Sequence, residues 1–239
     1  MSGAITAVFF DFGGTLADLR AERALLLQDD LKRIGFAVER SEVERALLDA
    51  HQWREQNRWP YFHDYQEREN HFVAYCAAIV RALGLPGDEA ELATRLWDVW
   101  DTSLEAWALY PDTRPCLETL ASSGLRLGVI SNWDKLNLPQ TCQQLSIAQH
   151  FTVMLSSAQA NADKPEPAIF RQALAAAGAE PGQAVHVGDS FHADVEGARA
   201  AGMGGIWLVR NGSPASPSCP VIRTLADLPA LLLTGQCNL

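Results

Sequence analysis

Short apolar runs without alternation recur in two separate parts of the chain. The first covers residues 5–10 and stops at Asp11. Such runs suit strands buried on both faces of a parallel sheet, and here they alternate with helical stretches. We therefore predict an α/β fold with a doubly wound, Rossmann-like parallel sheet. The later runs cover residues 125–130, 153–155, 184–187 and 205–209, and the helical stretches cover residues 111–123, 165–177 and 193–201.

The part between these two regions has helical periodicity and no convincing strand. Ser41 and Glu44 have the spacing of a capping box, and Asp64 and Glu67 precede another helical pattern. We predict an all-helical cap in residues 17–108, inserted into an α/β core of residues 1–16 and 109–239. The apolar faces that indicate the four helices are Leu27, Leu31 and Ile34; Val43, Leu47 and Ala50; Phe72, Tyr75, Ile79 and Leu83; and Leu92, Leu96 and Val99, with Ser103 beside them.

Composition and charge exclude several classes of protein. The chain has 239 residues, of which 48% are hydrophobic, and this content is typical of a globular protein. Its net charge of −10 argues against a general nucleic-acid binder. The five cysteines are odd in number and form no C-x-x-C pair, which predicts neither a disulfide framework nor a zinc site. With no apparent leader or membrane-spanning run, we expect a soluble cytoplasmic protein without a membrane partner, either a monomer or a homodimer.

Polar residues that directly follow the apolar runs are the candidates for chemistry. In open parallel sheets, ligands bind beyond the carboxyl ends of the strands, so these residues should meet in one crevice. Three carboxylates could hold Mg²⁺, an ammonium could neutralise a phosphoryl group, and a hydroxyl could bind another phosphoryl oxygen. Each residue alone has a simpler explanation as a turn former, helix cap or surface charge, so the prediction rests on the set. Its members are Asp11 with Thr15, Ser131 with Asn132, Lys164, and Asp189 with Asp194.

These motifs resemble those of the haloacid dehalogenase superfamily, in the branch with a helical cap after the first motif. The first motif is Asp11-Phe12-Gly13-Gly14-Thr15, and the second is Ser131-Asn132 after an apolar run. The third begins at Lys164-Pro165, and the fourth runs from Gly188-Asp189 to Asp194. Their order matches the family, and the resemblance covers nearly the whole chain.

The resemblance implies a role for each residue. Asp11 would be the nucleophile that forms a covalent aspartyl intermediate with a small phosphorylated substrate. Asp11, the Gly13 carbonyl and Asp189 would bind Mg²⁺, with Asp194 acting directly or through water. Ser131 would bind a phosphoryl oxygen, and Lys164 would balance the negative charge of Asp11 and the substrate. Thr15 would hold the loop, and amides near Phe12 and Gly13 would complete the oxyanion cradle. Asn132 would bind substrate or cap a helix.

Gly13 departs from the pattern of the family's phosphatases. They carry a second Asp at this position, which serves as general acid and base, whereas glycine can offer only its carbonyl. General acid–base catalysis contributes typically 10²–10⁴-fold, so ordinary alkyl phosphates should react slower by about that factor. The proton could instead come from water, from the substrate, or from a cap residue such as His63, Glu67 or His71.

Three other functions remain open, of which two are enzymatic. Carbon–phosphorus hydrolases of this family lack the second Asp and use a cap lysine, which here could only be Lys32. The namesake dehalogenases also lack that Asp, but they use no Mg²⁺ and lack the Gly188-Asp189 pair. A degenerate member that binds a ligand or protein without turnover is the alternative outside enzymes, although the retained Asp11 argues against it.

The predicted cap holds five of the seven tryptophans, which could face a substrate or pack the helices together. Packing is the more common role for such aromatic residues. Arg54 and Arg58 lie one helical turn apart and are the best candidates for contacting a second anionic group of the substrate. A solvated helix face explains these two arginines equally well.

Overall fold

The computed structural model describes residues 4–19, 22–57, 65–100, 107–133, 136–211 and 218–233. The chain divides into two compact units. One unit consists of Met1–Asp18 together with Ala108–Leu239, and the other is Leu19–Trp107. We call them the α/β unit and the helical unit.

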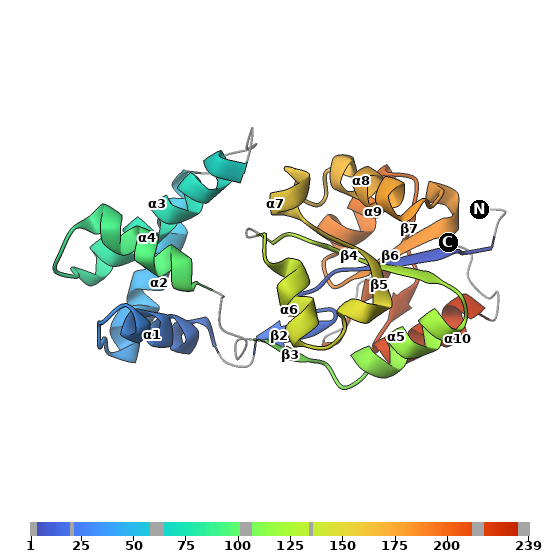
Figure 1. Ribbon diagram of the computed structural model, residues 1–239, viewed down its shortest axis with the longest axis horizontal. Helices are drawn as coiled ribbons and strands as arrows, with labels where there is room; N and C mark the ends of the chain where they lie inside the picture. The colour runs from blue at the N-terminus through green and yellow to red at the C-terminus, as the bar shows by residue number, and fades with distance from the viewer. Residues whose placement is uncertain are drawn as a thin grey trace. The chain divides into compact units, whose positions relative to one another are not determined.

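The α/β unit contains a six-stranded parallel sheet with the order β5-β4-β1-β6-β7-β8 (Figure 1). Strand β1 lies between β4 and β6, and the chain adds strands outward on both sides of it. This reversal of direction places a crevice at the carboxyl end of β1. The predicted doubly wound sheet is confirmed. The strands are β1 (Ala7–Phe10), β4 (Arg126–Ser131), β5 (Phe151–Ser156), β6 (Ala184–Gly188), β7 (Gly204–Leu208) and β8 (Val221–Ile222).

Helices cover both faces of this sheet. Helices α5 (Thr113–Ser122) and α10 (Leu228–Leu233) lie on one face, and α8 (Pro167–Ala177) and α9 (Gly197–Ala200) lie on the other (Figure 1). The sheet and the second pair of helices enclose a buried core that includes Phe9, Ile130 and Phe170. Phe9 fits because β4 has Gly128 opposite, where a Cβ would lie 2.6 Å from the Phe9 ring. Short helices α6 (Leu138–Gln144) and α7 (Ser157–Ala160) lie next to β5 in the sequence.

In its described residues, the helical unit has four helices and its own core. They are α1 (Arg23–Arg33), α2 (Arg40–Gln56), α3 (Tyr65–Leu83) and α4 (Glu89–Val99). Aromatic residues pack these helices together: Phe72 stacks on Trp97 with centroids 5.5 Å apart, and Tyr75 meets Trp100 edge to face at 6.0 Å. The packing role expected for most of the aromatic residues is therefore confirmed for Trp97 and Trp100.

Two details of the predicted helices are wrong. Helix α2 begins after Glu39 with no side chain capping it, so Ser41 and Glu44 do not form a capping box. Glu44 instead accepts a hydrogen bond from the Arg40 side chain at 2.7 Å, because four-residue spacing brings the two together on the helix surface. Helix α3 begins at Tyr65, so Glu67 lies in its first turn rather than before it.

Several short elements were not predicted. Strands β2 (Ala17–Leu19) and β3 (Trp107–Leu109) pair with each other, so the expectation of no strand in residues 17–108 is wrong at both ends. Three residues are too few to show a recognisable alternation. The helix expected at 193–201 is instead a π-helical turn, Phe191–Glu196, followed by α9. Within the described ranges, no helix is both long and apolar enough to cross a membrane.

Candidate active site

The candidate site forms at the carboxyl ends of three neighbouring strands. Asp11 directly follows β1, and its N–H donates to the Val187 carbonyl of β6 at 2.9 Å. Ser131 is the last residue of β4, and Asp189 follows the last residue of β6. Because β1 pairs with both of these strands, three residues that are distant in the sequence are brought to the same edge of the sheet.

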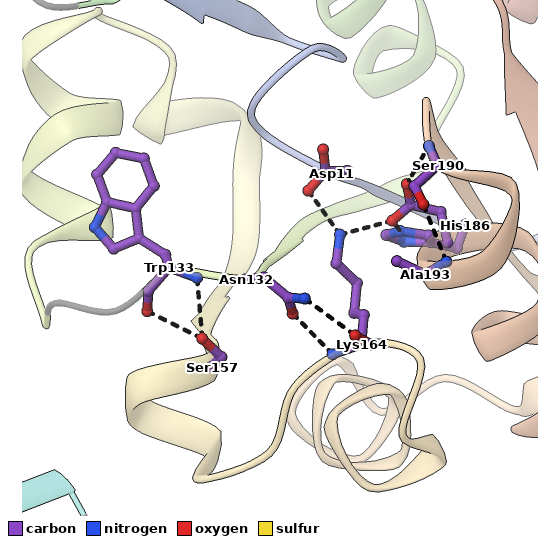
Figure 2. Close-up of polar contacts among 9 residues, drawn as sticks. Asp11, Asn132, Trp133, Ser157, Lys164, His186, Ser190 and Ala193 are labelled. Atoms are coloured by element: carbon purple, nitrogen blue, oxygen red, sulfur yellow. Dashed lines mark hydrogen bonds and ion pairs between the residues drawn. The ribbon is translucent and has the colours of Figure 1, made fainter. Parts of the chain in front are cut away.

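Lys164 lies between two carboxylates in this crevice. Its Nζ donates to Asp11 Oδ1 and to Asp194 Oδ1, both at 2.6 Å (Figure 2). The Lys164 side chain is only 3% exposed. A buried ammonium needs such partners, because removing a charge from water is costly unless opposite charges and hydrogen bonds replace the lost hydration. The geometry therefore joins the third motif to the first and the fourth.

Asn132 holds the Lys164 main chain. Its Oδ1 accepts from Lys164 N–H at 2.7 Å, and its Nδ2 donates to the Lys164 carbonyl at 3.0 Å (Figure 2). Both ends of the amide are thus engaged within the protein. This contact fixes the position from which the lysine side chain extends, and binding of substrate by Asn132 stays a prediction.

Three carboxylates meet closely enough to hold a metal ion. Ligand oxygens of Asp11, Asp189 and Asp194 lie within 4.8 Å of one another. Two glycines make room for them: a Cβ on Gly14 would lie 2.4 Å from Asp189 Oδ2, and one on Gly188 would lie 2.1 Å from Asp194 Cγ. An all-oxygen, anionic donor set suits a hard divalent cation such as Mg²⁺. The residues present therefore fit the metal that the sequence resemblance implies.

Burial and neighbouring charges shift the ionisation of these groups. Burial raises the pKa of Asp11 to about 6, although the ammonium of Lys164 opposes this. Burial acts in the same direction on Asp194, but Lys164 and a hydrogen bond from His186 hold the pKa of Asp194 well below its usual range. Burial and the charge of Asp194 raise the pKa of Asp189. The site therefore gathers three carboxyl groups around one buried ammonium.

The loop after Asp11 turns tightly before β2. Gly14 has a φ of +76°, which favours glycine, and its N–H donates to the Ala17 carbonyl at 2.8 Å. The Phe12 side chain is buried and meets Trp133 edge to face at 5.3 Å, so this side chain packs within the protein. Thr15 is also fully buried, and its carbonyl accepts from Arg210 Nη2 at 2.8 Å.

The candidates in residues 17–108 lie in or beside the helical unit. Arg54 lies with its guanidinium 5.4 Å from the centre of the Phe72 ring, within that unit. His71 is buried between Trp53 and Phe72, and this burial lowers the pKa of its imidazole. Lys32 is on the surface, with 66% of its side chain exposed and Asp29 at 3.9 Å. Arg58 and His63 lie outside the described residues.

His186 is part of the site although the sequence patterns did not single it out. It lies within β6, fully buried, and its Nε2 is 3.0 Å from Asp194 Oδ1. One signal was available in the sequence: a lone polar residue in an otherwise apolar strand, three residues before Asp189. A buried imidazole requires a partner, and the nearby strand-end carboxylates could have indicated which one.

The chain is similar to several known proteins. It is 31% identical to phosphoserine phosphatase of Thermus thermophilus over 152 residues, which make up 64% of this chain and 61% of that protein. A solved haloacid dehalogenase (HAD) phosphatase from Thermococcus onnurineus matches with a TM-score of 0.67 and 28% identity, covering 95% of this chain and 98% of that one. A 2-haloacid dehalogenase from Pseudomonas syringae matches with a TM-score of 0.68 and 28% identity, covering 98% of this chain and all of that one.

Several of the curated relatives match over only part of their length, with the aligned segment spanning between 41% and 61% of it. The family comparison extends much further along this chain. The family described as haloacid dehalogenase-like hydrolase matches residues 5–202, a range that includes the strand ends and all the side chains that meet in the crevice. The chain belongs to the haloacid dehalogenase-like hydrolases.

Proposed function

We propose that this hydrolase is a Mg²⁺-dependent phosphatase that uses Asp11 as its nucleophile. The observation that carries the proposal is the cluster at the strand ends, where Lys164 bridges Asp11 and Asp194 and a third carboxylate, Asp189, lies within metal-ligand reach. One cation from the protein and one from a divalent metal suit the charge of a phosphoryl group. The phosphatase names of two of the relatives described above support the same chemistry.

In the proposed reaction, an ionised Asp11 oxygen attacks phosphorus. The bond from phosphorus to the leaving oxygen breaks, and that oxygen keeps the electron pair and takes a proton from solvent. A water molecule then attacks phosphorus of the aspartyl phosphate and loses a proton to solvent. The bond from phosphorus to the Asp11 oxygen breaks, which releases inorganic phosphate and restores the Asp11 carboxylate. When bound by Asp11, Asp189, the Gly13 carbonyl and Asp194, Mg²⁺ would supply charge neutralisation for the phosphoryl oxygens.

The other residues orient the substrate and complete the charge balance. Lys164 faces the developing negative charge from its position beside Asp11 and is held there by Asn132. Ser131, at the end of β4, would bind a phosphoryl oxygen through its hydroxyl. The buried Thr15 would hold the loop that presents the amides near Phe12 and Gly13.

The substrate we propose is a small phosphorylated molecule whose leaving group needs little help from an acid. Gly13 has no side chain to protonate an alkoxide, so aryl and acyl phosphates should react faster than alkyl phosphates. We propose that the helical unit acts as the cap that selects among such substrates. Arg54 and Arg58 are its candidate contacts for a second anionic group.

A second candidate is carbon–halogen hydrolysis, favoured by Gly13 and by the match to a 2-haloacid dehalogenase. The acidic cluster favours phosphoryl transfer, because a halide leaving group needs no divalent metal. The exposed position of Lys32 argues against the carbon–phosphorus alternative, since an amine nucleophile is usually activated by a buried or cationic environment.

The test is to compare aryl phosphates, acyl phosphates and 2-chloropropionate as substrates of the full chain, with Mg²⁺ and with EDTA. We expect phosphate release that requires Mg²⁺ and is lost in Asp11→Asn. Halide release that is insensitive to EDTA would favour the dehalogenase instead. Phosphate release that survives Asp11→Asn would overturn the assignment of the nucleophile.

A further inference from the structure

His186 is enclosed on nearly all sides by the α/β core. It is the middle residue of strand β6 and has no exposed surface. Its ring packs edge to face against Phe170, with the ring centroids 5.2 Å apart. Its Nε2 reaches Asp194 Oδ1 at 3.0 Å (Figure 2). Burying a polar ring costs free energy unless the ring is hydrogen-bonded, and here the bond to Asp194 offsets part of that cost.

The surroundings determine the tautomer of this ring. A carboxylate accepts hydrogen bonds, so the proton must lie on Nε2, which then donates to Asp194. Nδ1 is buried and has no hydrogen-bond partner in the described part of the chain. It is therefore the nitrogen that lacks a proton, because leaving a lone pair unpaired is less costly than leaving an N–H unpaired.

Asp194 is held on both of its oxygens. Oδ1 accepts from Lys164 Nζ at 2.6 Å and from His186, while Oδ2 accepts from the Ser190 N–H at 2.9 Å. The absence of a Cβ at Gly188 lets the carboxylate lie against the β6 main chain. Three donors therefore hold this carboxylate through both of its oxygens.

We infer that His186 is a positioning residue, whose Nε2–H fixes the Asp194 carboxylate and thereby holds the Lys164 ammonium against Asp11. This inference rests on the proposed phosphatase reaction for its kinetic consequences. Lys164 has two acceptors, and its direction is defined only while both stay in place. Without the imidazole donor, Asp194 keeps only one donor on each oxygen, Lys164 on Oδ1 and the Ser190 N–H on Oδ2, so the carboxylate that receives the ammonium is less firmly held. Loss of a comparable hydrogen bond behind a catalytic or metal-binding group typically costs 10–100-fold in activity or metal affinity.

Two substitutions separate the hydrogen bond from the packing. His186→Phe keeps a ring of similar size in the core but has no donor, whereas His186→Gln keeps an N–H donor. With an aryl phosphate and saturating Mg²⁺, we expect His186→Phe to lower kcat by about 10–100-fold with KM within about threefold of wild type, and His186→Gln to recover most of that loss. His150→Phe is the matched control, because His150 lies before β5, at the opposite edge of the sheet from the site.

Melting temperatures for all variants show whether a loss of activity follows a loss of stability. Equal impairment of His186→Phe and His186→Gln at equal stability would overturn the inference, as would a His186→Phe enzyme that keeps at least half of wild-type kcat. A merely structural role predicts losses that track the melting temperature for both variants.

Nitrogen-15 NMR of the imidazoles provides a readout that does not depend on turnover. We expect a proton on Nε2 of His186, in slow exchange with water, and a shift of that signal in Asp194→Asn. A ring with no proton on Nε2 would overturn the inference. If wild type hydrolyses no phosphate while the Nε2–H signal responds to Asp194→Asn, the proposed function fails but the His186–Asp194 contact stands.

Discussion

Gly13 determines which half of the proposed reaction is slow. A phosphatase with a carboxyl group at this position can protonate the leaving oxygen and later deprotonate the attacking water. With glycine, an activated leaving group can still depart without help, but the incoming water has no base. The second step should then be slower than the first whenever the substrate is an aryl or acyl phosphate.

This imbalance predicts that phosphorylated Asp11 accumulates during turnover. Rapid-quench mass spectrometry with an aryl phosphate should detect the added phosphoryl group on the peptide that contains Asp11. In Gly13→Asp, we expect steady-state turnover of alkyl phosphates to rise by about 10²-fold, the lower end of the usual contribution of general acid–base catalysis. Asp11→Asn is the control and should show neither the intermediate nor turnover. An intermediate that never accumulates, together with no gain in Gly13→Asp, would contradict the explanation.

At the level of elements, Asp112 joins three parts of the α/β unit. It precedes α5, and its carboxylate pairs with Arg210, beyond β7, at 2.9 and 3.1 Å. The same carboxylate accepts from the Thr224 hydroxyl and from the Leu225 N–H, just before α10. Arg210 also donates to the Thr15 carbonyl, so this cluster connects helices on one face of the sheet with the loop that follows Asp11.

We predict a pH-dependent contribution of Asp112 to stability. Burial raises the pKa of Asp112, but hydrogen bonds from Arg210, Thr224 and Leu225 hold it below the ordinary 3.8. A carboxyl with a lowered folded-state pKa stabilises the protein above its unfolded pKa, and this stabilisation disappears as the pH falls through the folded-state value. Asp112→Asn should therefore lower the free energy of unfolding by about 2 kcal/mol at pH 7, as expected for hydrogen bonds to a charged group.

The measurement is the difference in melting temperature between wild type and Asp112→Asn, taken from pH 7 down to pH 3. This difference should stay constant down to about pH 5 and shrink below about pH 4. Asp29→Asn is the control: Asp29 is an exposed residue 3.9 Å from Lys32, and its replacement should change stability by less than about 0.5 kcal/mol at any of these pH values. A difference for Asp112→Asn that grows on acidification would contradict the assignment.

The sequence indicated long elements better than short ones. The strand expected at residues 125–130 is Arg126–Ser131, because a buried parallel strand is a continuous apolar run. Strands β2 and β3 carry no such signal, since they are three residues long and are defined by pairing with each other. The π-helical turn before α9 also gave no signal, because periodicity alone does not distinguish it from an α-helix.

The same contrast holds for the candidate site. The position of Asp11 and the approach of Lys164 follow from strand ends that meet at one edge of a parallel sheet. The contact of Asn132 with the Lys164 main chain could not be predicted, because it depends on where the third-motif loop folds back onto the end of β4. His186 was not predicted, because a single polar residue within an apolar strand does not by itself indicate a functional role. Its burial nevertheless makes the hydrogen bond to Asp194 obligatory.

At the scale of the whole molecule, each unit has its own core and the chain passes between them twice. The helical unit buries Leu27, Leu31, Ile79 and Leu96 among its own helices. The α/β unit is interrupted after Asp18 and resumes at Ala108. The two crossing points lie in β2 and β3, which are neighbours in a two-stranded sheet. The ends of the interrupted α/β unit are therefore already adjacent, as neighbouring strands lie about 5 Å apart.

This adjacency predicts that the helical unit can be removed without unfolding the α/β unit. Replacing residues 20–106 with a short Gly/Ser linker should give a folded protein, because all the strands of the parallel sheet and the Asp11, Lys164 and Asp194 cluster remain. If the helical unit selects substrates, this protein should hydrolyse a small aryl phosphate with kcat/KM within about tenfold of wild type, while its preference among phosphorylated metabolites disappears. Circular dichroism checks folding, and a panel of phosphorylated metabolites measures selectivity. If the folded deletion protein kept the wild-type preference among phosphorylated metabolites, the proposed role of the helical unit would be contradicted. The residues that select the substrate would then have to lie at the strand ends of the α/β unit and in their loops.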